Sequence, residues 1–287
     1  MDDRQLLESI RDLIGRTETS DDCAAFPLDN GKKILVSTTD MLHETTDFPK
    51  GMTEWQMGWM SVAVSLSDVA SCGAQPTQIL VAAGLDRAER LKPIMEGAVA
   101  CAKACDAKIA GGDIDSHTEL TIVTTAFGVV DKEYYCTRSG AQPGDLVCVT
   151  GRPGAAQAGL DGYSGYWENL VMPKPQVFTG QRIAHSGATA MMDVSDGLAI
   201  SLYDMSEASG VGFDLRENHL PLLPIADAKR YFLYGGGGDY GLLFTIPQEK
   251  FVKMDVPVSV IGEVVEGDGV RMGDEQVEKR GYAHHID

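Results

Sequence analysis

The segment that decides the fold is TEWQMGWMSVAVSLSDVASCG, residues 53–73. Thr53 is suited to the N-cap of a helix, and Gln56 three residues later completes a capping box. Apolar side chains then recur at helical spacing, which predicts a buried stripe made of Trp55, Trp59, Val62, Ala63, Leu66, Val69 and Ala70. Gly73 is a suitable stop for this helix, because glycine readily adopts the backbone conformation that follows a last turn.

Strands and helices alternate on both sides of this helix. KILVSTTD predicts a strand over 34–38 before it, and ILVAAGL predicts another over 79–85 after it. A helix is expected over 89–105 and a long strand over 118–130. A short amphipathic helix carrying Leu6, Leu7, Ile10, Leu13 and Ile14 opens the chain. This alternation predicts an α/β or α+β sheet that is covered by helices.

The segment RSGAQPGD, residues 138–145, concentrates Gly, Pro and Ser, which predicts a domain boundary near Thr137. The expected domains are therefore 1–137 and 138–287. The second half starts afresh with the strand LVCVTG, followed by a helix begun by Pro175. MMDVSDG is expected to be a strand feeding a loop, and LAISLYDMSEASG a helix that stops at Gly210. The glycine loop 235–238 enters a strand, and VSVIGEVV predicts a further strand.

Composition excludes several classes of function. The chain has 287 residues, with 24 Lys plus Arg against 42 Asp plus Glu, and a net charge of −18. Such a surface repels a nucleic-acid backbone and anionic membranes, so neither is expected as a partner. A small phosphorylated substrate remains compatible with this charge, provided that divalent cations stand between it and the carboxylates.

Neither targeting nor disulfide formation is expected. No apolar run approaches the roughly 18 residues of a membrane span, and residues 1–15 lack the basic and apolar regions of a signal peptide. The six cysteines are thinly spread and form no C-x-x-C, which favours reduced, buried thiols. We expect a cytoplasmic protein.

The candidate chemistry lies in acidic residues beside Gly, Ser or Thr. They are Asp21-Asp22, Thr38-Thr39-Asp40, Ser67-Asp68, Gly111-Gly112-Asp113 and Asp193-Val194-Ser195-Asp196. Carboxylates placed where strands give way to loops suit a hard cation such as magnesium, which prefers oxygen ligands. Any one of these sites alone is also ordinary turn or N-cap composition. Asp68 differs, because it lies within the apolar helix and is costly to bury without a positive partner.

Phosphate-binding signatures of the P-loop, dinucleotide-binding and protein-kinase types are missing. Arg138, directly before the glycine-rich break, suits either a phosphate clamp or a surface charge.

Taken together and in order, these motifs resemble the thiamine-monophosphate kinase family over nearly the whole chain. The matching segments are SDDCAAF (20–26), STTDMLHETTDF (37–48), GWMSVAVSLSDVASCGAQP (58–76), GGDID (111–115), TRSGAQPGDLVCVTGRPG (137–154), MDVSDGL (192–198), GGGGDYGLLF (235–244) and GYAHH (281–285). Single motifs also occur in the wider superfamily that includes aminoimidazole-ribonucleotide synthetase.

The resemblance implies a two-domain α+β fold. The N-terminal domain, a sheet with helices, would pair with that of a second subunit into a β-barrel, and the C-terminal domain would be an α/β sandwich. ATP would lie in the cleft between the domains of a homodimer. The implied reaction is magnesium-assisted, in-line transfer of a phosphoryl group from ATP to thiamine monophosphate, giving thiamine diphosphate, with several magnesium ions bound.

The resemblance also assigns roles by position. Its magnesium-binding residues correspond to Asp22, Thr38, Thr39, Asp40, Asp68, Asp113, Asp193 and Asp196. The nucleotide contacts correspond to Gly112, Asp113, Arg138 and Ser195, and the substrate contacts to Asp47, Gly238 and Tyr282. Asp40, Asp113 and Asp196 are the expected catalytic residues.

Two of the substrate positions depart from the family pattern. Many members carry His where Asp47 stands and Glu where Gly238 stands, and Gly241 replaces a second acid. Two alternatives therefore stay open: another ATP-using enzyme of the superfamily, such as aminoimidazole-ribonucleotide synthetase, and a non-catalytic nucleotide-binding homologue.

Overall fold

Helix α2 (Glu54–Ser71) forms as the sequence predicts. Thr53 accepts a hydrogen bond from the main-chain N–H of Gln56, and the Gln56 side chain accepts one from the N–H of Thr53, so the capping box is confirmed. The buried surface is wider than the predicted stripe, because almost every residue from Met57 onward is buried. Trp55 and Trp59 at the start are only half-buried and stack on each other, with ring centroids 5.6 Å apart.

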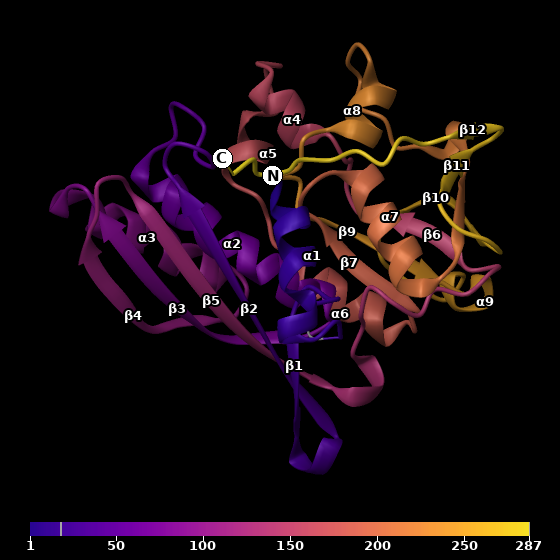
Figure 1. Ribbon diagram of the computed structural model, residues 1–287, viewed down its shortest axis with the longest axis horizontal. Helices are drawn as coiled ribbons and strands as arrows, with labels where there is room; N and C mark the ends of the chain where they lie inside the picture. The colour runs from indigo at the N-terminus through magenta and orange to yellow at the C-terminus, as the bar shows by residue number, and fades with distance from the viewer. Residues whose placement is uncertain (18, 287) are drawn as a thin grey trace.

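The computed structural model describes residues 1–17 and 19–286, and α2 lies between two sheets (Figure 1). The first sheet has five strands in the order β1-β2-β5-β3-β4. Its strands are β1 (Ala24–Leu28), β2 (Lys33–His43), β3 (Gln75–Leu85), β4 (Lys108–Ser116) and β5 (Thr121–Asp131). Only β3 and β4 pair in parallel, and the helix α3 (Leu91–Ala104) connects them. Helices α2 and α3 cover one face of this sheet.

The opposite face of the first sheet is open. Along β5 the side chains alternate between buried positions, such as Ile122 and Ala126, and partly exposed ones. On the open face Phe26, Met41 and Leu80 are 52%, 58% and 39% exposed. An apolar sheet face without a covering layer is unusual for a monomer.

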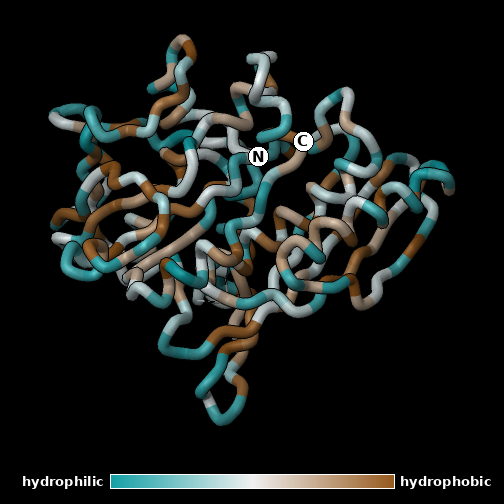
Figure 2. Tube along the Cα trace, turned by 180° about the vertical axis from the view of Figure 1, so that it is seen from behind, coloured by the Kyte–Doolittle hydropathy of each residue, from teal (hydrophilic) through white to brown (hydrophobic). Residues whose placement is uncertain are grey.

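The second sheet has seven strands in the order β12-β11-β8-β10-β6-β9-β7. They are β6 (Leu146–Val149), β7 (Ala190–Val194), β8 (Gly212–Leu215), β9 (Gly241–Ile246), β10 (Ser259–Val265), β11 (Val270–Met272) and β12 (Glu275–Gln276). The helices of this half are α4 (Ala155–Leu160), α5 (Trp167–Val171), α6 (Val177–His185), α7 (Leu198–Ser209), α8 (Ala228–Tyr234) and α9 (Gln248–Phe251). In both halves many residues of the strands and helices are hydrophobic, whereas many connecting loops are hydrophilic (Figure 2).

Close helix contacts fix the position of α2. A Cβ atom on Gly58 of α2 would lie 1.8 Å from the carbonyl oxygen of Ile94, and one on Gly97 of α3 would lie 1.8 Å from that of Trp55. Only glycine permits this approach. On its other side α2 packs against α6 from the second half, so α2 contacts both parts of the chain.

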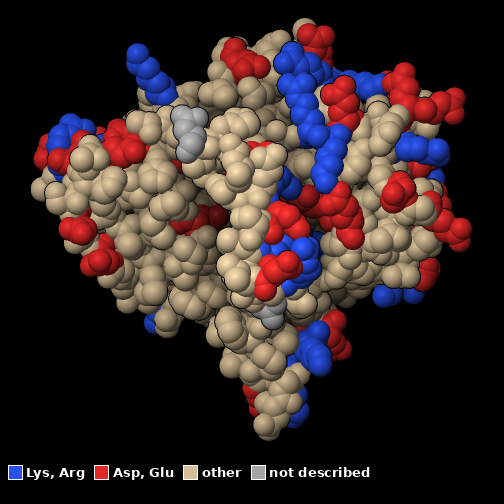
Figure 3. All heavy atoms as spheres, viewed as in Figure 1, with Lys and Arg blue, Asp and Glu red and all other residues tan. Residues whose placement is uncertain are grey.

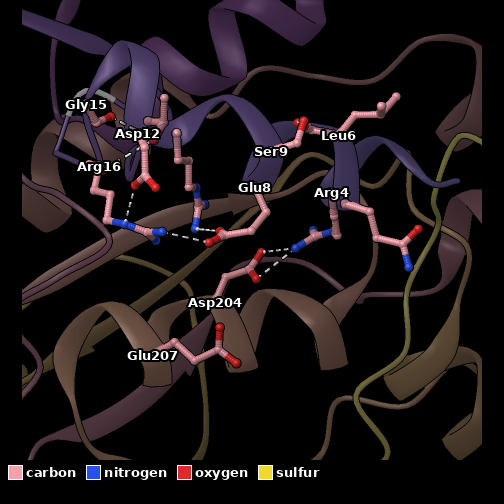
Figure 4. A network of polar contacts seen from close by, with 12 residues as sticks. Arg4, Leu6, Glu8, Ser9, Asp12, Gly15, Arg16, Asp204 and Glu207 are labelled. Carbon is pink, nitrogen blue, oxygen red and sulfur yellow. Dashed lines mark hydrogen bonds and ion pairs between the residues drawn. The ribbon is translucent and has the colours of Figure 1, made fainter.

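The first residues of the chain lie beside residues 282–286. Met1 and Ile286 exchange two hydrogen bonds, and the N–H of Asp3 donates to the carbonyl of His284. From α1 (Asp3–Ile14), Arg4 reaches Asp204 on α7, at 2.8 and 3.0 Å (Figure 4). We call the paired segments 1–4 and 282–286 the clasp.

Most predicted elements are confirmed, with changed limits. The strand expected over 34–38 extends through Lys33–His43, and α1 and α7 form as expected, α7 ending at Gly210 in the left-handed conformation. The expectation that the acidic motifs follow strand ends is wrong for Asp40 and Asp113, which lie inside β2 and β4. The predicted boundary at Thr137 falls in the segment between the last strand of the first sheet and the first strand of the second.

All six cysteines are free and buried. Within residues 1–17 and 19–286, none of the helices combines the length and apolar character required to cross a bilayer.

Candidate active site

A cavity of about 660 Å³ opens between the two halves. Its charged lining consists of eight aspartates and two basic residues: Asp3, Asp21, Asp22, Asp40, Asp47, Asp68, Asp193 and Asp196, with Lys50 and Arg138. Acidic side chains recessed between the halves are visible in Figure 3. So strong an excess of carboxylates in a partly enclosed space requires cations when the groups are ionised.

Hydroxyl groups of α2 orient three of these carboxylates. Ser65 donates to Asp40 at 2.6 Å, Ser67 to Asp193 at 2.6 Å and Ser71 to Asp22 at 2.5 Å. These carboxylates come from β2, from β7 and from the segment before β1. A single helix thus holds acidic groups from both halves of the chain in one arrangement.

Asp68, which lies on α2 itself, is a further carboxylate of the cavity lining. Its Oδ2 atom accepts a hydrogen bond of 2.6 Å from Thr38. Thr38 and Asp40 share the α2-facing side of β2, because alternate residues of a strand point to the same face.

Burial and mutual repulsion make these carboxylates weak acids. Burial, together with the charge of Asp22, raises the pKa of Asp193 to about 8. Burial and then the charges of Asp40 and Asp193 raise the pKa of Asp68 well above its ordinary value. The pKa of Asp40 is also raised, mainly by burial. A nearby divalent cation would favour the ionised forms and reverse these shifts.

The donor set fits magnesium. It consists of carboxylate and hydroxyl oxygens, which are the ligands of a hard cation. In the part of the chain that the structure describes, no three His, Cys, Asp or Glu side chains already converge on one point. The acids therefore surround a shared space in which ions and phosphate oxygens could complete one another's coordination.

Arg138 is one of the two basic residues that line the cavity. Its Nε atom donates to Oδ1 of Asp22 at 2.6 Å, and its main-chain N–H donates to Asp21 at 3.2 Å. Burial opposes the charge of Arg138, but the carboxylates of Asp22 and Asp204 outweigh that effect and raise its pKa. Burial and the charge of Asp22 raise the pKa of Asp21 to about 6.

Ser195 and Asp196 follow β7 and line the cavity. Asp196 is paired with Arg4 at 3.1 Å, and burial still raises its pKa although Arg4 opposes the shift. The main-chain carbonyl of Asp196 accepts a hydrogen bond of 2.8 Å from the N–H of Tyr282. Arg4 and Tyr282 thereby connect this loop to the clasp.

The glycine loop 235–238 forms another wall. Gly237 and Gly238 have φ values of 93° and 83°, and a Cβ atom on Gly237 would lie 2.1 Å from the carbonyl oxygen of Ser195. Asp239 anchors the loop by accepting hydrogen bonds from the N–H groups of Gly154 (2.6 Å) and Ala156 (2.9 Å). Glycine is therefore required where the loop passes closest to Ser195.

The structure brings most of the candidate residues together. The cavity is lined by Asp22, Asp40, Asp47, Asp68, Arg138, Asp193, Ser195, Asp196, Gly238 and Tyr282, and Thr38 contacts Asp68 behind it.

Three candidates lie elsewhere. The registers of β2, β5, β3 and β4 place Thr39 and Asp113 on the open face of the first sheet, away from α2. Gly112 and Asp113 belong to the edge strand β4 and border a separate apolar depression beside α3.

Sequence reasoning missed several residues at the cavity. They are Ser65 and Ser71 of α2, Arg4, Asp3, Lys50 and Tyr240. The serines did leave a signal, since hydroxyls recurring in an otherwise apolar helix need buried partners. Arg4 and Asp3 left none, because their contacts depend on segments about two hundred or more positions away.

Comparisons with known proteins agree with this architecture. The family described as AIR synthase related protein, N-terminal domain, matches residues 20–130. The chain is 51% identical to a thiamine-monophosphate kinase of Methanospirillum hungatei, over 99% of this chain and 100% of that protein. It is 38% identical to one of Halobacterium salinarum, again over 99% and 100%.

A solved structure described as AaThiL complexed with AMPPCP and TMP superposes with a TM-score of 0.91. Sequence identity to it is 27%, and the match covers 99% of this chain and 97% of that one. The full-length identity to these two enzymes, together with this fold, shows that the chain belongs to the thiamine-monophosphate kinase family.

Proposed function

We propose that this chain transfers a phosphoryl group from ATP to thiamine monophosphate and forms thiamine diphosphate and ADP. The observation that carries this function is the convergence of Asp22, Asp40, Asp68 and Asp193 from both halves on one cavity. It is supported by family membership and by the likeness to a structure that holds AMPPCP and TMP.

The residues of the cavity suit a reaction between two anions. The acceptor is a phosphate that is already ionised at neutral pH, so no general base is needed to create the nucleophile. The main obstacle is repulsion between the phosphate groups, and positioning with charge stabilisation removes it. Arg138 can bind two phosphate oxygens at once, and Ser195 offers a hydroxyl donor on the facing loop.

Magnesium ions would be held by Asp22, Asp40, Asp68, Asp193 and Asp196, with Thr38 supporting Asp68. Bound there, they would neutralise phosphate charge and align the donor with the acceptor. The serine hydroxyls of α2 keep the carboxylates oriented for this task.

The thiamine moiety would lie toward Asp47, Gly238 and Tyr282. Asp47 carries a carboxylate suited to a cationic ring. Gly238 has no side chain, so it provides space but no charge at its position. Tyr282 offers an aromatic ring at the rim, where it is 39% exposed.

We further propose a homodimer in which the open faces of the first sheets join into a barrel. Three observations support it: the exposed apolar side chains Phe26, Met41 and Leu80, the edge position of β4, and the few charges over this region in Figure 3. In such a dimer Asp113 and Thr39, which face away from the cavity of their own chain, can approach the site of a second copy. The two domains would be 1–137 and 138–287.

An ADP-release assay with and without magnesium tests this function. Magnesium-dependent turnover with thiamine monophosphate is the expected result. Turnover only with formylglycinamidine ribonucleotide would instead indicate an aminoimidazole-ribonucleotide synthetase. Magnesium-dependent ATP binding without turnover on either acceptor would indicate a non-catalytic homologue.

A further inference from the structure

We propose that Asp3, in the first turn of α1, is a specificity-determining residue whose carboxylate acts with that of Asp47 to recognise the cationic ring of the acceptor. The inference rests on the proposed function and extends it to a residue outside the motifs that identify the family. It makes the clasp part of the substrate site.

The carboxylates that line the cavity fall into two groups. Asp22, Asp40, Asp68, Asp193 and Asp196 are the expected magnesium ligands, and Asp21 accepts a hydrogen bond from Arg138. Of the eight aspartates that line the cavity, these six lie with the phosphate-binding machinery, and only Asp3 and Asp47 remain.

Hydrogen bonds orient the carboxylates of Asp3 and Asp47. Oδ1 of Asp3 accepts a hydrogen bond of 2.9 Å from the N–H of Arg4, and the main chain of Asp3 is fixed to His284. Oδ2 of Asp47 accepts from the N–H of His43 and from Thr46, both at 2.7 Å. Among the described residues neither carboxylate has an ion-pair partner, so each keeps a charged oxygen available.

Asp3, Asp47 and Tyr282 line the same cavity. The N–H of Asp3 donates a hydrogen bond to the carbonyl of His284, and the rings of His284 and Tyr282 pack edge to face with centroids 4.9 Å apart. Asp196 forms an ion pair with Arg4, whereas neither Asp3 nor Asp47 has an ion-pair partner in the part of the chain that the structure describes. Next to an aromatic ring, two unpaired carboxylates form a site for a cation with a flat face.

The acceptor supplies that cation. Thiamine monophosphate carries a permanently charged thiazolium ring on the same molecule as its phosphate. If the phosphate faces the magnesium-binding acids, the ring must lie farther along the cavity, toward the part of its lining that includes Asp3, Asp47 and Tyr282. Attraction between a partly buried carboxylate and this ring favours thiamine monophosphate over a neutral molecule of the same shape.

A binding experiment with two ligands tests the proposal. Thiamine monophosphate is compared with its deaza analogue, in which carbon replaces the charged nitrogen and the phosphate is kept. Calorimetry uses the whole protein with magnesium and a non-hydrolysable ATP analogue. Asp3→Asn, which retains the hydrogen bond from Arg4, should weaken binding of the charged ligand about tenfold and leave the neutral ligand unchanged.

Two control variants, Asp12→Asn and Asp3→Glu, are measured in the same way. Asp12→Asn removes the same charge from an exposed position of α1 and should change neither affinity, and Asp3→Glu should retain the preference for the charged ligand. Thermal melting identifies folded samples, and Asp3→Ser replaces Asp3→Asn if the latter does not melt cooperatively. Equal weakening of both ligands, or no change in either, would overturn the role of Asp3. If the wild-type protein binds neither ligand, the proposed function itself fails.

Discussion

The hydroxyl of Ser67 donates a hydrogen bond of 2.6 Å to Oδ2 of Asp193, and both residues are buried. This bond joins α2 to β7 and therefore links the two halves of the chain at the cavity. It also opposes the rise in the pKa of Asp193, because it favours the ionised carboxylate.

We expect Ser67→Ala to lower the free energy of unfolding by about 2 kcal/mol, since a buried carboxyl oxygen loses its donor. It should also raise the magnesium concentration needed for half-maximal activity. Ser61→Ala is the matched control, because Ser61 is equally buried but donates within α2 to the carbonyl of Met57. Equal magnesium dependence in the two variants would contradict a role for Ser67 in the site.

Replacing Arg138 with Gln should leave Asp22 buried without its cation and lower stability by about 3 kcal/mol in the absence of magnesium. Saturating magnesium should recover much of this loss in a thermal or urea melt, because the ion takes over as the partner of Asp22. Arg90→Gln provides the control, since Arg90 is 2% exposed and is paired with Glu44 and Asp86. A variant at Arg138 that magnesium does not rescue would refute the proposed ion site.

Asp40→Asn and Asp113→Asn are each expected to reduce turnover by about 10³-fold or more while the fold is preserved. Asp40 lines the cavity of its own chain, whereas Asp113 lies on the opposite side of the sheet. If Asp113 serves a second copy, each mixed dimer of the two variants regains one intact site. Random mixing should then restore about a quarter of wild-type activity.

The mixed-dimer assay requires subunits exchanged by co-expression or refolding, with each variant alone as control. Activity that stays at the level of the single variants would show that both residues act in one chain, or that the proposed dimer does not form. Near-native activity of either variant at saturating magnesium would remove that residue from the catalytic set.

Stability should depend on pH through Asp239. Burial raises the pKa of this carboxyl to about 6, although main-chain N–H groups of residues 154–156 oppose the shift. A raised pKa means that the folded state binds the proton more tightly than the unfolded chain, so this contribution is present at low pH and lost as pH rises through 6. Relative to Asp239→Asn, wild type should lose about 2 kcal/mol between pH 4.5 and pH 7.

The measurement compares urea unfolding of the two proteins across that range, since other titrating groups cancel in the difference. Asn retains one acceptor oxygen for Gly154 or Ala156, which keeps the glycine loop in place. A constant difference between the two proteins would show that Asp239 does not change its protonation in this range.

Local sequence patterns predicted the elements well where one physical signal dominated. The capping box at Thr53 and the glycine stop after α7 are examples, because each depends on residues only a few positions apart. The strand β4 was missed, since its Gly-Gly-Asp segment has the composition of a turn and its pairing with β3 is a tertiary interaction. The same ambiguity made Asp113 look like a loop carboxylate.

The sequence indicated candidate residues of the site but not how they are arranged in space. Ordered acidic motifs indicated candidate metal ligands, and five of the six aspartates among them, Asp22, Asp40, Asp68, Asp193 and Asp196, line one cavity. Because side chains alternate along β2, Thr39 lies on the face opposite Thr38. The sequence did not indicate this difference, since the predicted strand ended at Thr38 and the observed strand continues to His43. The contribution of the clasp depends on contacts across nearly the whole chain and has no local signature.

The close approach of α2 and α3 limits which mutations this protein tolerates at Gly58 and Gly97. Since α2 carries the hydroxyls that hold carboxylates from both halves, a side chain at either glycine would displace several of these contacts together. Substitutions far from any phosphate would then produce the phenotype of an active-site lesion. The helix crossing therefore constrains which sequences can evolve as strictly as the acidic residues themselves.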